Sequence, residues 1–479
     1  MKKRRRPASF VLAAQKIVLP PCGSRNDANG SHVGEGIEYR SMSLIEQTRK
    51  AGVVGAGGGG FPAHVKFAAR AEIVIGNGAE CEPLLHKDAA VIEHRAREVV
   101  RGIELVMDAV GAREGVLGIK EKKKAVVAAA QEACEGSRVR VHLLGDYYPA
   151  GDEYDLVFAV TGKLIPPQGL PLHVGAVVSN VETLAQVADA ALGRPVTRKM
   201  VTIAGAVENP STFDVPIGIS YRDLIAAAGG ATCADPVLQI GGMMMGRTSE
   251  SLDVHITKTD AGAIVLPREH KAIERKLRPK DAQKRIGRSA CDQCRYCTEF
   301  CSRFLLGYAV EPHQVMRGLG FSSAGSAQWD PWASLCSGCG LCTLYACPED
   351  LYPKEACDDA KVELRATGFK WTGPAPTKPH PFHDGRRVPI ERLVSKLGIG
   401  AWDRPAPFRP LPQEPARLVL LLKQSAGAAA RPSVSAGQTV RKGDALGAPP
   451  DGEMGAILHA PITARVESVS DEAIVLVQA

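Results

Sequence analysis

The chain has 479 residues, of which 45% are hydrophobic and 23% are charged, and its formal net charge is +7. This length is enough for about three or four domains. The run from Lys2 to Arg6 supplies five of the positive charges, so the rest of the chain lacks the basic surface of a nucleic-acid-binding protein. The sequence contains no run of about 18 apolar residues, and we therefore expect no transmembrane segment.

Residues 1–41 show little hydrophobic periodicity. Their basic start, followed by the apolar stretch Ala8–Ala14, faintly resembles a signal peptide, but the apolar stretch is short. We expect a disordered extension or a misassigned start, with a targeting segment as the alternative. An amphipathic helix is expected to open at Met42.

Strand-like and helical patterns alternate between residues 42 and 198. Apolar strands are expected at 72–76, 116–119 and 139–144, and helices at 89–110 and 122–134. This alternation predicts an α/β domain with a largely parallel sheet. Ligands bind such sheets at the loops that follow the strands.

Four polar loops in this domain are the candidate binding site. Backbone N–H groups of a glycine-rich turn can approach a phosphate, and Lys66 adds a positive charge. The other loops offer amide and carboxylate groups for ribityl or ribose hydroxyls, although each is also consistent with an ordinary turn or helix cap. The candidates, in loop order, are Gly55, Gly57, Gly58, Gly60, Phe61 and Lys66; Asn77, Glu80 and Glu82; Tyr148, Gly151, Asp152 and Glu153; and Asn180 and Thr183.

The rest of the chain divides by composition. The strand and helix patterns of residues 199–270 predict a small α+β unit, and residues 280–366 contain the cysteine-rich region. Residues 367–415 form a proline-rich linker or extended wrap, because ten prolines fall between 374 and 415. Residues 416–479 alternate strand signals with glycine turns, which is typical of a β barrel-sandwich.

Two cysteine runs carry the clearest chemical signal. Their spacings are C-x2-C-x2-C-x3-C and C-x2-C-x2-C-x4-C, and they contain Cys291, Cys294, Cys297 and Cys301, then Cys336, Cys339, Cys342 and Cys347. Four thiolates hold one [4Fe–4S] cluster, and in two-cluster ferredoxins the fourth cysteine of a run ligates the other cluster. We therefore assign Cys347 to the first three cysteines and Cys301 to the second three. Paired zinc sites are the alternative, although a zinc ribbon has no use for a third cysteine at this spacing.

The four polar loops resemble those of the 51 kDa flavoprotein subunit of respiratory complex I and of its relative in the Rnf electron-transport complex. The motifs are G-x-G-G-x-G-F-P, N-x-x-E-x-E-P, Y-x-x-G-[DE]-E and N-V-E-T, at Gly55–Pro62, Asn77–Pro83, Tyr148–Glu153 and Asn180–Thr183. The resemblance implies that the loops enclose FMN and NADH. It further implies a β-grasp unit of the SLBB type at 199–270, an α-helical ferredoxin-type domain with two [4Fe–4S] clusters and a C-terminal β barrel-sandwich.

The domain order resembles the cobalamin reductase family of propanediol-utilisation microcompartments, whose barrel-sandwich also comes last. That likeness implies that NADH reduces FMN and that the clusters pass single electrons to a corrinoid, taking cobalamin to cob(I)alamin. Expected partners are a corrinoid adenosyltransferase and shell proteins, and the expected location is cytoplasmic, within a bacterial microcompartment. The alternatives are an Rnf-type protein that feeds electrons to a membrane complex or ferredoxin, and a non-enzymatic iron–sulfur scaffold.

Overall fold

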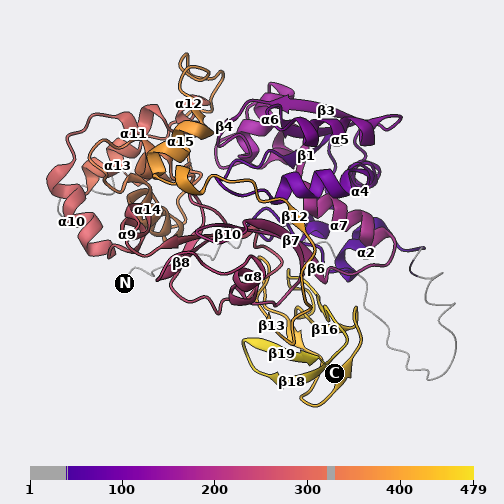
Figure 1. The fold of residues 1–479 in the computed structure, drawn as a ribbon. Coiled ribbons are helices and arrows are strands. Elements are labelled where there is room, and N and C mark those ends of the chain that lie inside the picture. Colours follow the sequence, from indigo (N-terminus) through magenta and orange to yellow (C-terminus); the bar gives the residue numbers. More distant parts are fainter. Residues whose placement is uncertain (1–38, 40, 321–329, 479) are drawn as a thin grey trace, which may run out of the picture.

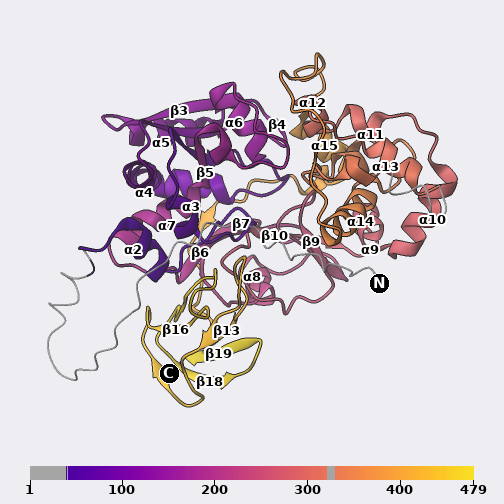
Figure 2. The same ribbon diagram turned by 180° about the vertical axis from the view of Figure 1, so that it is seen from behind.

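The computed structural model describes residues 39, 41–320 and 330–478, so nearly all of the predicted extension 1–41 lies outside the described residues. In both views the α/β domain, coloured indigo to magenta, and an orange helical region lie above a central sheet, and the yellow C-terminal domain lies below it (Figures 1 and 2). The central sheet therefore lies between the C-terminal domain and the other two parts.

The α/β domain contains a four-stranded sheet in the order β3-β2-β1-β5, and all neighbouring strands are parallel. Its strands are β1 (Ile73–Gly78), β2 (Glu114–Lys120), β3 (Val139–Leu144) and β5 (Ala176–Asn180). The residues of β1 are almost all buried, as expected for a strand with helices on both faces. The predicted α/β layer and its first three strands are confirmed.

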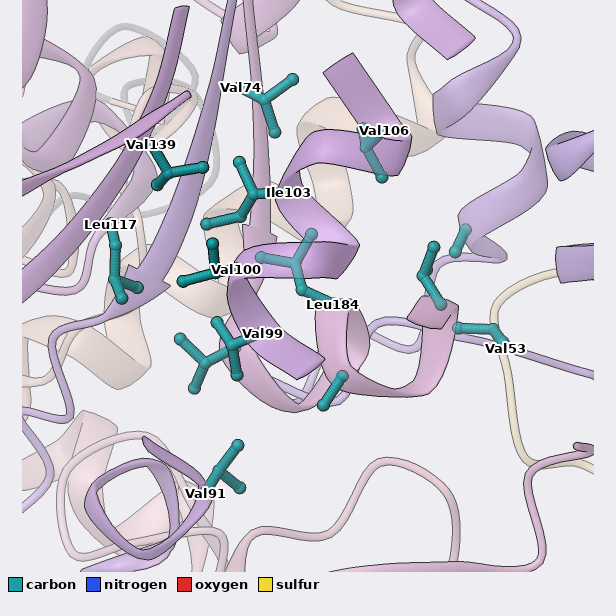
Figure 3. Close-up of a cluster of buried hydrophobic side chains, with 14 of the residues drawn as sticks. Val53, Val74, Val91, Val99, Val100, Ile103, Val106, Leu117, Val139 and Leu184 are labelled. Carbon is teal, nitrogen blue, oxygen red and sulfur yellow. The ribbon is translucent and has the colours of Figure 1, made fainter. Parts of the chain in front are cut away.

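Helices on the two faces of this sheet bury its apolar side chains. They are α4 (Lys87–Val110), α5 (Lys124–Cys134), α6 (Glu153–Thr161) and α7 (Val181–Ala191), with the short α2 (Leu44–Lys50), α3 (Ala63–Phe67) and η1 (Pro171–Val174). Figure 3 shows Val100 and Ile103 of α4 among Leu117 of the sheet and Leu184 of α7. The predicted helices at 89–110 and 122–134 correspond to α4 and α5.

The central sheet has six strands in the order β12-β7-β6-β10-β8-β9. The strands are β6 (Arg198–Gly205), β7 (Ser211–Pro216), β8 (Pro236–Ile240), β9 (Arg247–Ser249), β10 (Gly262–Pro267) and β12 (Phe408–Arg409), and α8 (Tyr221–Ala227) packs with them. The sheet shares one hydrophobic core with the C-terminal domain, because Val201 and Leu238 belong to the same cluster as Leu418 and Leu476.

The C-terminal domain consists of two small antiparallel sheets. One is ordered β13-β19-β18-β15, with β13 (Arg417–Leu421), β19 (Ala473–Gln478), β18 (Ala464–Val469) and β15 (Thr439–Val440). The other is β14-β16-β17, with β14 (Arg431–Pro432), β16 (Ala445–Ala448) and β17 (Leu458–His459).

Helices and the loops between them form the cysteine-rich region. The helices are α9 (Lys271–Leu277), α10 (Lys280–Ala290), α11 (Tyr296–Glu299), α12 (Ser302–Leu305), α13 (Pro312–Gly318), η3 (Asp330–Ala333), η4 (Cys342–Ala346) and α14 (Pro353–Ala366). Among the described residues, none of the helices combines the length and apolarity that crossing a membrane requires.

The proline-rich segment 367–415 crosses several parts of the molecule. It contributes β11 (Val388–Pro389), which pairs with β4 (Tyr147–Tyr148) of the α/β domain. It then forms α15 (Ile390–Leu397) and η5 (Gly400–Trp402), and β12 joins the central sheet beside β7. The segment therefore wraps the cysteine-rich region and the central sheet with defined contacts.

Close packing of α4 on α7 depends on a glycine. A Cβ built on Gly102 would lie 2.0 Å from the Leu184 carbonyl oxygen. Although alanine is the better helix former, we expect Gly102→Ala to lower the free energy of unfolding by about 1–3 kcal/mol, because the helices must separate. Urea unfolding measures this change. Gly400→Ala is the control, since a Cβ there meets nothing within 4 Å, and a comparable loss in it would contradict the packing explanation.

Candidate functional site

All fifteen residues of the four predicted loops line a single cleft of about 800 Å³. The cleft lies where β1 ends at Gly78 and β5 ends at Asn180, which are adjacent parallel strands. Ligand pockets typically enclose ~300–1,000 Å³, so the space suits a nucleotide-sized molecule. The structure thus brings together loops that are more than a hundred residues apart in the chain.

Thr183 holds the glycine-rich loop against α7. Its hydroxyl accepts a hydrogen bond from the Ala56 N–H at 2.9 Å and donates to the Val54 carbonyl at 3.3 Å. Gly58 has a φ of 101°, which favours glycine, and a Cβ on Gly58 or Gly59 would meet nothing within 4 Å. The loop is therefore fixed at its base and presents bare backbone to the cleft, which fits a phosphate-bearing cofactor.

Two lysines line the cleft together with the glycine-rich loop. The Lys66 amine donates to the Val178 carbonyl at 2.7 Å and lies 3.7 Å from the Glu153 carboxylate. No sequence motif indicated Lys87, which is 1% exposed and forms ion pairs with Asp88 at 2.7 Å and Glu182 at 3.3 Å. Lys87 also donates to the Ala56 carbonyl at 3.2 Å, so it supports the loop.

The second loop combines an amide with two carboxylates. Asn77 donates to the Gly151 carbonyl at 2.9 Å and thereby ties the second loop to the third. Glu82 accepts hydrogen bonds from the Met244 and Met245 N–H groups at 2.9 and 2.8 Å, yet burial raises its pKa. Burial, together with the Asp88 carboxylate, raises the pKa of Glu80 to about 7.

The third loop joins the cleft to the cysteine-rich region. Asp152 and Asn180 both cap helices, α6 and α7 respectively, as their residue types predict. Asp152 additionally accepts a hydrogen bond from Arg303 at 3.0 Å. The buried Tyr148 hydroxyl donates to the Cys339 carbonyl at 2.7 Å, and Cys339 itself lines the cleft.

The thiols of the first group share a small cavity near the surface. Cys291, Cys294, Cys297 and Cys347 all line it, and Cys294 is exposed. Burial, followed by the thiols of Cys347, Cys291 and Cys294, raises the pKa of Cys297 to about 12. Cysteines from two distant segments therefore line one cavity, as the predicted first ligand set requires, and the assignment of a [4Fe–4S] cluster to them stays a prediction.

The second group lies deeper and next to the cleft. Cys301, Cys339 and Cys342 are each 8% exposed or less. Burial raises the pKa of Cys301, and the next contributions come from Cys339 and Cys336, so its neighbours are the second run rather than its own. Cys301 thus lies beside the second cysteine run, as the predicted crossed pairing requires, and its role as a cluster ligand stays a prediction.

The central sheet supplies a wall of the cleft that the sequence did not reveal as part of the site. Its contributions are Ile240, Gly241, Met245, Gly246, Arg247, Thr259, Asp260 and Ala261. The glycines around the methionine run at 243–245 were only a weak signal of this wall. They indicate a turn, but they do not show that the turn packs against the α/β domain.

Four family models match successive parts of the chain. They are the Nuo51 FMN-binding domain over residues 48–189, the SLBB domain over 200–248, a 4Fe-4S dicluster domain over 290–352 and the RnfC barrel sandwich hybrid domain over 407–478. These matches confirm the predicted fold class. The boundaries proposed at 42, 199, 280, 367 and 416 stay predictions.

Two of the curated relatives match nearly the whole chain, and a third matches about half of it. Cobalamin reductase PduS of Salmonella typhimurium is 41% identical, covering 91% of this chain and 96% of its own. Cobalamin reductase PduS of Citrobacter freundii is 38% identical, with coverages of 92% and 97%. A component of the Na(+)-translocating ferredoxin:NAD(+) oxidoreductase complex of Acetobacterium woodii is 35% identical over 48% of this chain and 54% of its own.

The fold, the cleft and the two thiol groups define an oxidoreductase that combines an FMN-binding domain with a 4Fe-4S dicluster domain. Within this class, the chain belongs to the cobalamin reductase PduS family.

Glu80 should make stability depend on pH. Because its pKa rises from 4.5 to about 7 on folding, the folded chain binds the extra proton between these values, and stability falls as the pH rises through that window. We expect Glu80→Gln to remove this loss, so its thermal midpoint should rise relative to wild type between about pH 4.5 and 7. Glu153→Gln, at a side chain 46% exposed, is the control. If the difference in thermal midpoint between Glu80→Gln and wild type did not change with pH, the pKa shift would be ruled out.

The ligand assignment predicts which cluster each cysteine serves. Cys347→Ser should damage the cluster held by Cys291, Cys294 and Cys297, whereas Cys301→Ser should damage the other, each leaving about half of the iron. Iron analysis and EPR of the reduced proteins measure this. Cys134→Ser, in α5, should retain all of the iron. Identical residual EPR spectra in the two ligand variants would contradict the crossed pairing.

Proposed function

We propose that the protein is an NADH-dependent flavin and iron–sulfur reductase that delivers single electrons to a corrinoid. In this proposal, the cleft binds FMN and NADH, the eight cysteines hold two [4Fe–4S] clusters, and cobalamin is reduced to cob(I)alamin. The fifteen cleft residues and the crossed cysteine pairing are the proposed ligands.

The observation that carries the proposal is the wall shared by the cleft and one thiol group. Cys339 lines the cleft that the flavin-family loops enclose, and the Tyr148 hydroxyl fixes the Cys339 backbone at 2.7 Å. Arg303, two residues after Cys301, reaches Asp152 at 3.0 Å. Two hydrogen bonds from the loop at 148–153 thus fix the cysteine-rich region to the cleft.

In this proposal, the residues of the cleft bind and orient FMN and NADH. The glycine-rich loop offers backbone N–H groups to a phosphate, and Lys66, Asn77 and Glu80 line the same cleft. When bound, FMN accepts a hydride from NADH and releases electrons singly, which iron–sulfur clusters carry onward.

The burial of the two thiol groups indicates an order of electron transfer. The group with Cys339 is next to the cleft and buried, whereas the group with Cys294 reaches the surface. In our proposal electrons enter at the group with Cys339 and leave from the group with Cys294, so the electron acceptor docks near Cys294.

Family membership supports the choice of acceptor. The PduS relatives are named cobalamin reductases and match over more than nine-tenths of this chain, whereas the Rnf-type relative matches about half. By the same reasoning, we propose a corrinoid adenosyltransferase and shell proteins as partners, and a bacterial microcompartment in the cytoplasm as the location.

Anaerobic reconstitution with FMN, iron and sulfide tests the proposal. We expect NADH to bleach the flavin absorbance and to reduce aquacobalamin, because the cleft and both thiol groups are in place. Ferricyanide and ferredoxin are the comparison acceptors. Reduction of ferricyanide alone would remove the support for a corrinoid acceptor, and the absence of flavin bleaching would contradict NADH as the donor.

A further inference from the structure

The C-terminal barrel-sandwich domain touches the glycine-rich loop directly. The Ala426 N–H, in the segment between β13 and β14, donates to the Gly60 carbonyl at 2.9 Å. A Cβ on Gly60 would lie 2.8 Å from the Thr259 methyl group and 3.4 Å from the Ser425 Cα, so three parts of the chain converge on this glycine. The outer end of the loop is therefore held by another domain, while Thr183 holds its base.

Lys258 is the centre of this junction. It belongs to the segment between β9 and β10, and it is 2% exposed. Its amine donates at 2.7 Å to the Gly52 carbonyl, which precedes the glycine-rich loop, and at 2.7 Å to the Ile457 carbonyl of the barrel-sandwich domain. One side chain thus links the α/β domain, the central sheet and the C-terminal domain.

The main chain of Lys258 extends the same junction. Its N–H donates to the Gln424 side-chain oxygen at 3.0 Å, and its carbonyl accepts from the buried Lys199 amine at 3.1 Å. Gln424 directly precedes Ser425 and Ala426, so the contact fixes the segment that reaches Gly60. On the other side, Thr259, Asp260 and Ala261 directly follow Lys258 and line the cleft.

The geometry at Gly52 shows how tightly the junction is packed. Gly52 has a φ of 67°, and a Cβ there would lie 2.3 Å from the Ile457 carbonyl oxygen and 2.6 Å from the Lys258 amine. Burial lowers the pKa of Lys258 to about 7, and both of its acceptors are uncharged carbonyl oxygens. An amine buried at such cost, with two short bonds to different domains, is suited to fixing their relative position.

The structure assigns to Lys258 and the Gln424–Ala426 segment the role of positioning the FMN loop: the barrel-sandwich domain closes on residues 55–60 and sets the affinity of the cleft for FMN. This inference rests on the proposed function, since it takes FMN as the ligand of the cleft. Lys258 is a positioning residue, because it acts through the loop and the cleft wall.

Lys258→Met tests the assignment, because methionine keeps an apolar stem of similar length and removes both bonds to the carbonyls. We expect the dissociation constant for FMN to rise at least about tenfold, as two buried acceptors lose their donor and the loop loosens. Flavin fluorescence titration of the full-length, cluster-containing protein measures it well below the thermal midpoint. Hydrogen exchange without added FMN should show faster exchange in residues 55–62, and the iron content should stay unchanged.

Val466→Ala is the matched control. Val466 is buried in the core of the same domain on β18, the strand at the bottom of the yellow domain in Figure 1, and it makes none of the junction hydrogen bonds described above. Its truncation therefore destabilises the domain without removing a contact to the glycine-rich loop. We expect it to lower the thermal midpoint while leaving the FMN dissociation constant within about twofold of wild type.

The outcomes separate the inference from the proposed function. Unchanged FMN affinity and unchanged loop exchange in Lys258→Met, with FMN bound normally by wild type, would overturn the positioning role alone. An equal loss of FMN affinity in Val466→Ala would also overturn it, since general instability would then explain both. A wild-type protein that binds no FMN would contradict the proposed function and this inference with it.

Discussion

The hydrogen bond from the Tyr148 hydroxyl to the Cys339 carbonyl is the contact on which the functional arrangement depends. Tyr148 comes from β4, the short strand that follows β3, and Cys339 comes from the second cysteine run, 191 residues later. Because both residues line the cleft, a cofactor held by the glycine-rich loop shares a wall with one thiol group. Cofactor enzymes depend on such placement, since the chemistry belongs to the cofactor and the protein supplies its position.

Buried charges behind the cleft explain how separate domains hold this position. Although burial opposes it, Lys199 and Lys87 keep the pKa of Glu182 below its ordinary value. Lys87 belongs to the α/β domain and Lys199 to β6, so Glu182 joins the cleft floor to the central sheet. Removing one partner would leave an uncompensated buried charge, which is far more costly than the pair itself. The cleft is therefore an assembly of domains, and its shape depends on their docking.

Sequence patterns predicted the elements and loops of the α/β domain, because strand burial and glycine-rich turns are local properties. They also predicted the fifteen residues that the structure brings to one cleft, through four motifs with fixed spacing. Lys87 was missed because one lysine at the start of a helix carries no motif. Thr259, Asp260 and Gln424 were missed because their contacts arise only when domains dock. The predicted linker 367–415 forms β11, α15 and β12, since its prolines mask short elements that are stabilised by neighbouring domains.

In the proposed route, electrons enter through the thiol group beside the cleft and leave through the exposed one. Freeze-quench EPR after NADH is mixed with FMN-loaded protein tests it most directly, because each ligand variant retains a single intact thiol group. Cys347→Ser retains the cluster beside the cleft, and we expect that cluster to be reduced as fast as it is in wild type. Cys301→Ser retains the cluster near Cys294, and we expect that cluster to be reduced far more slowly. Equal rates in the two variants, or the reverse order, would contradict the route from the cleft through Cys339.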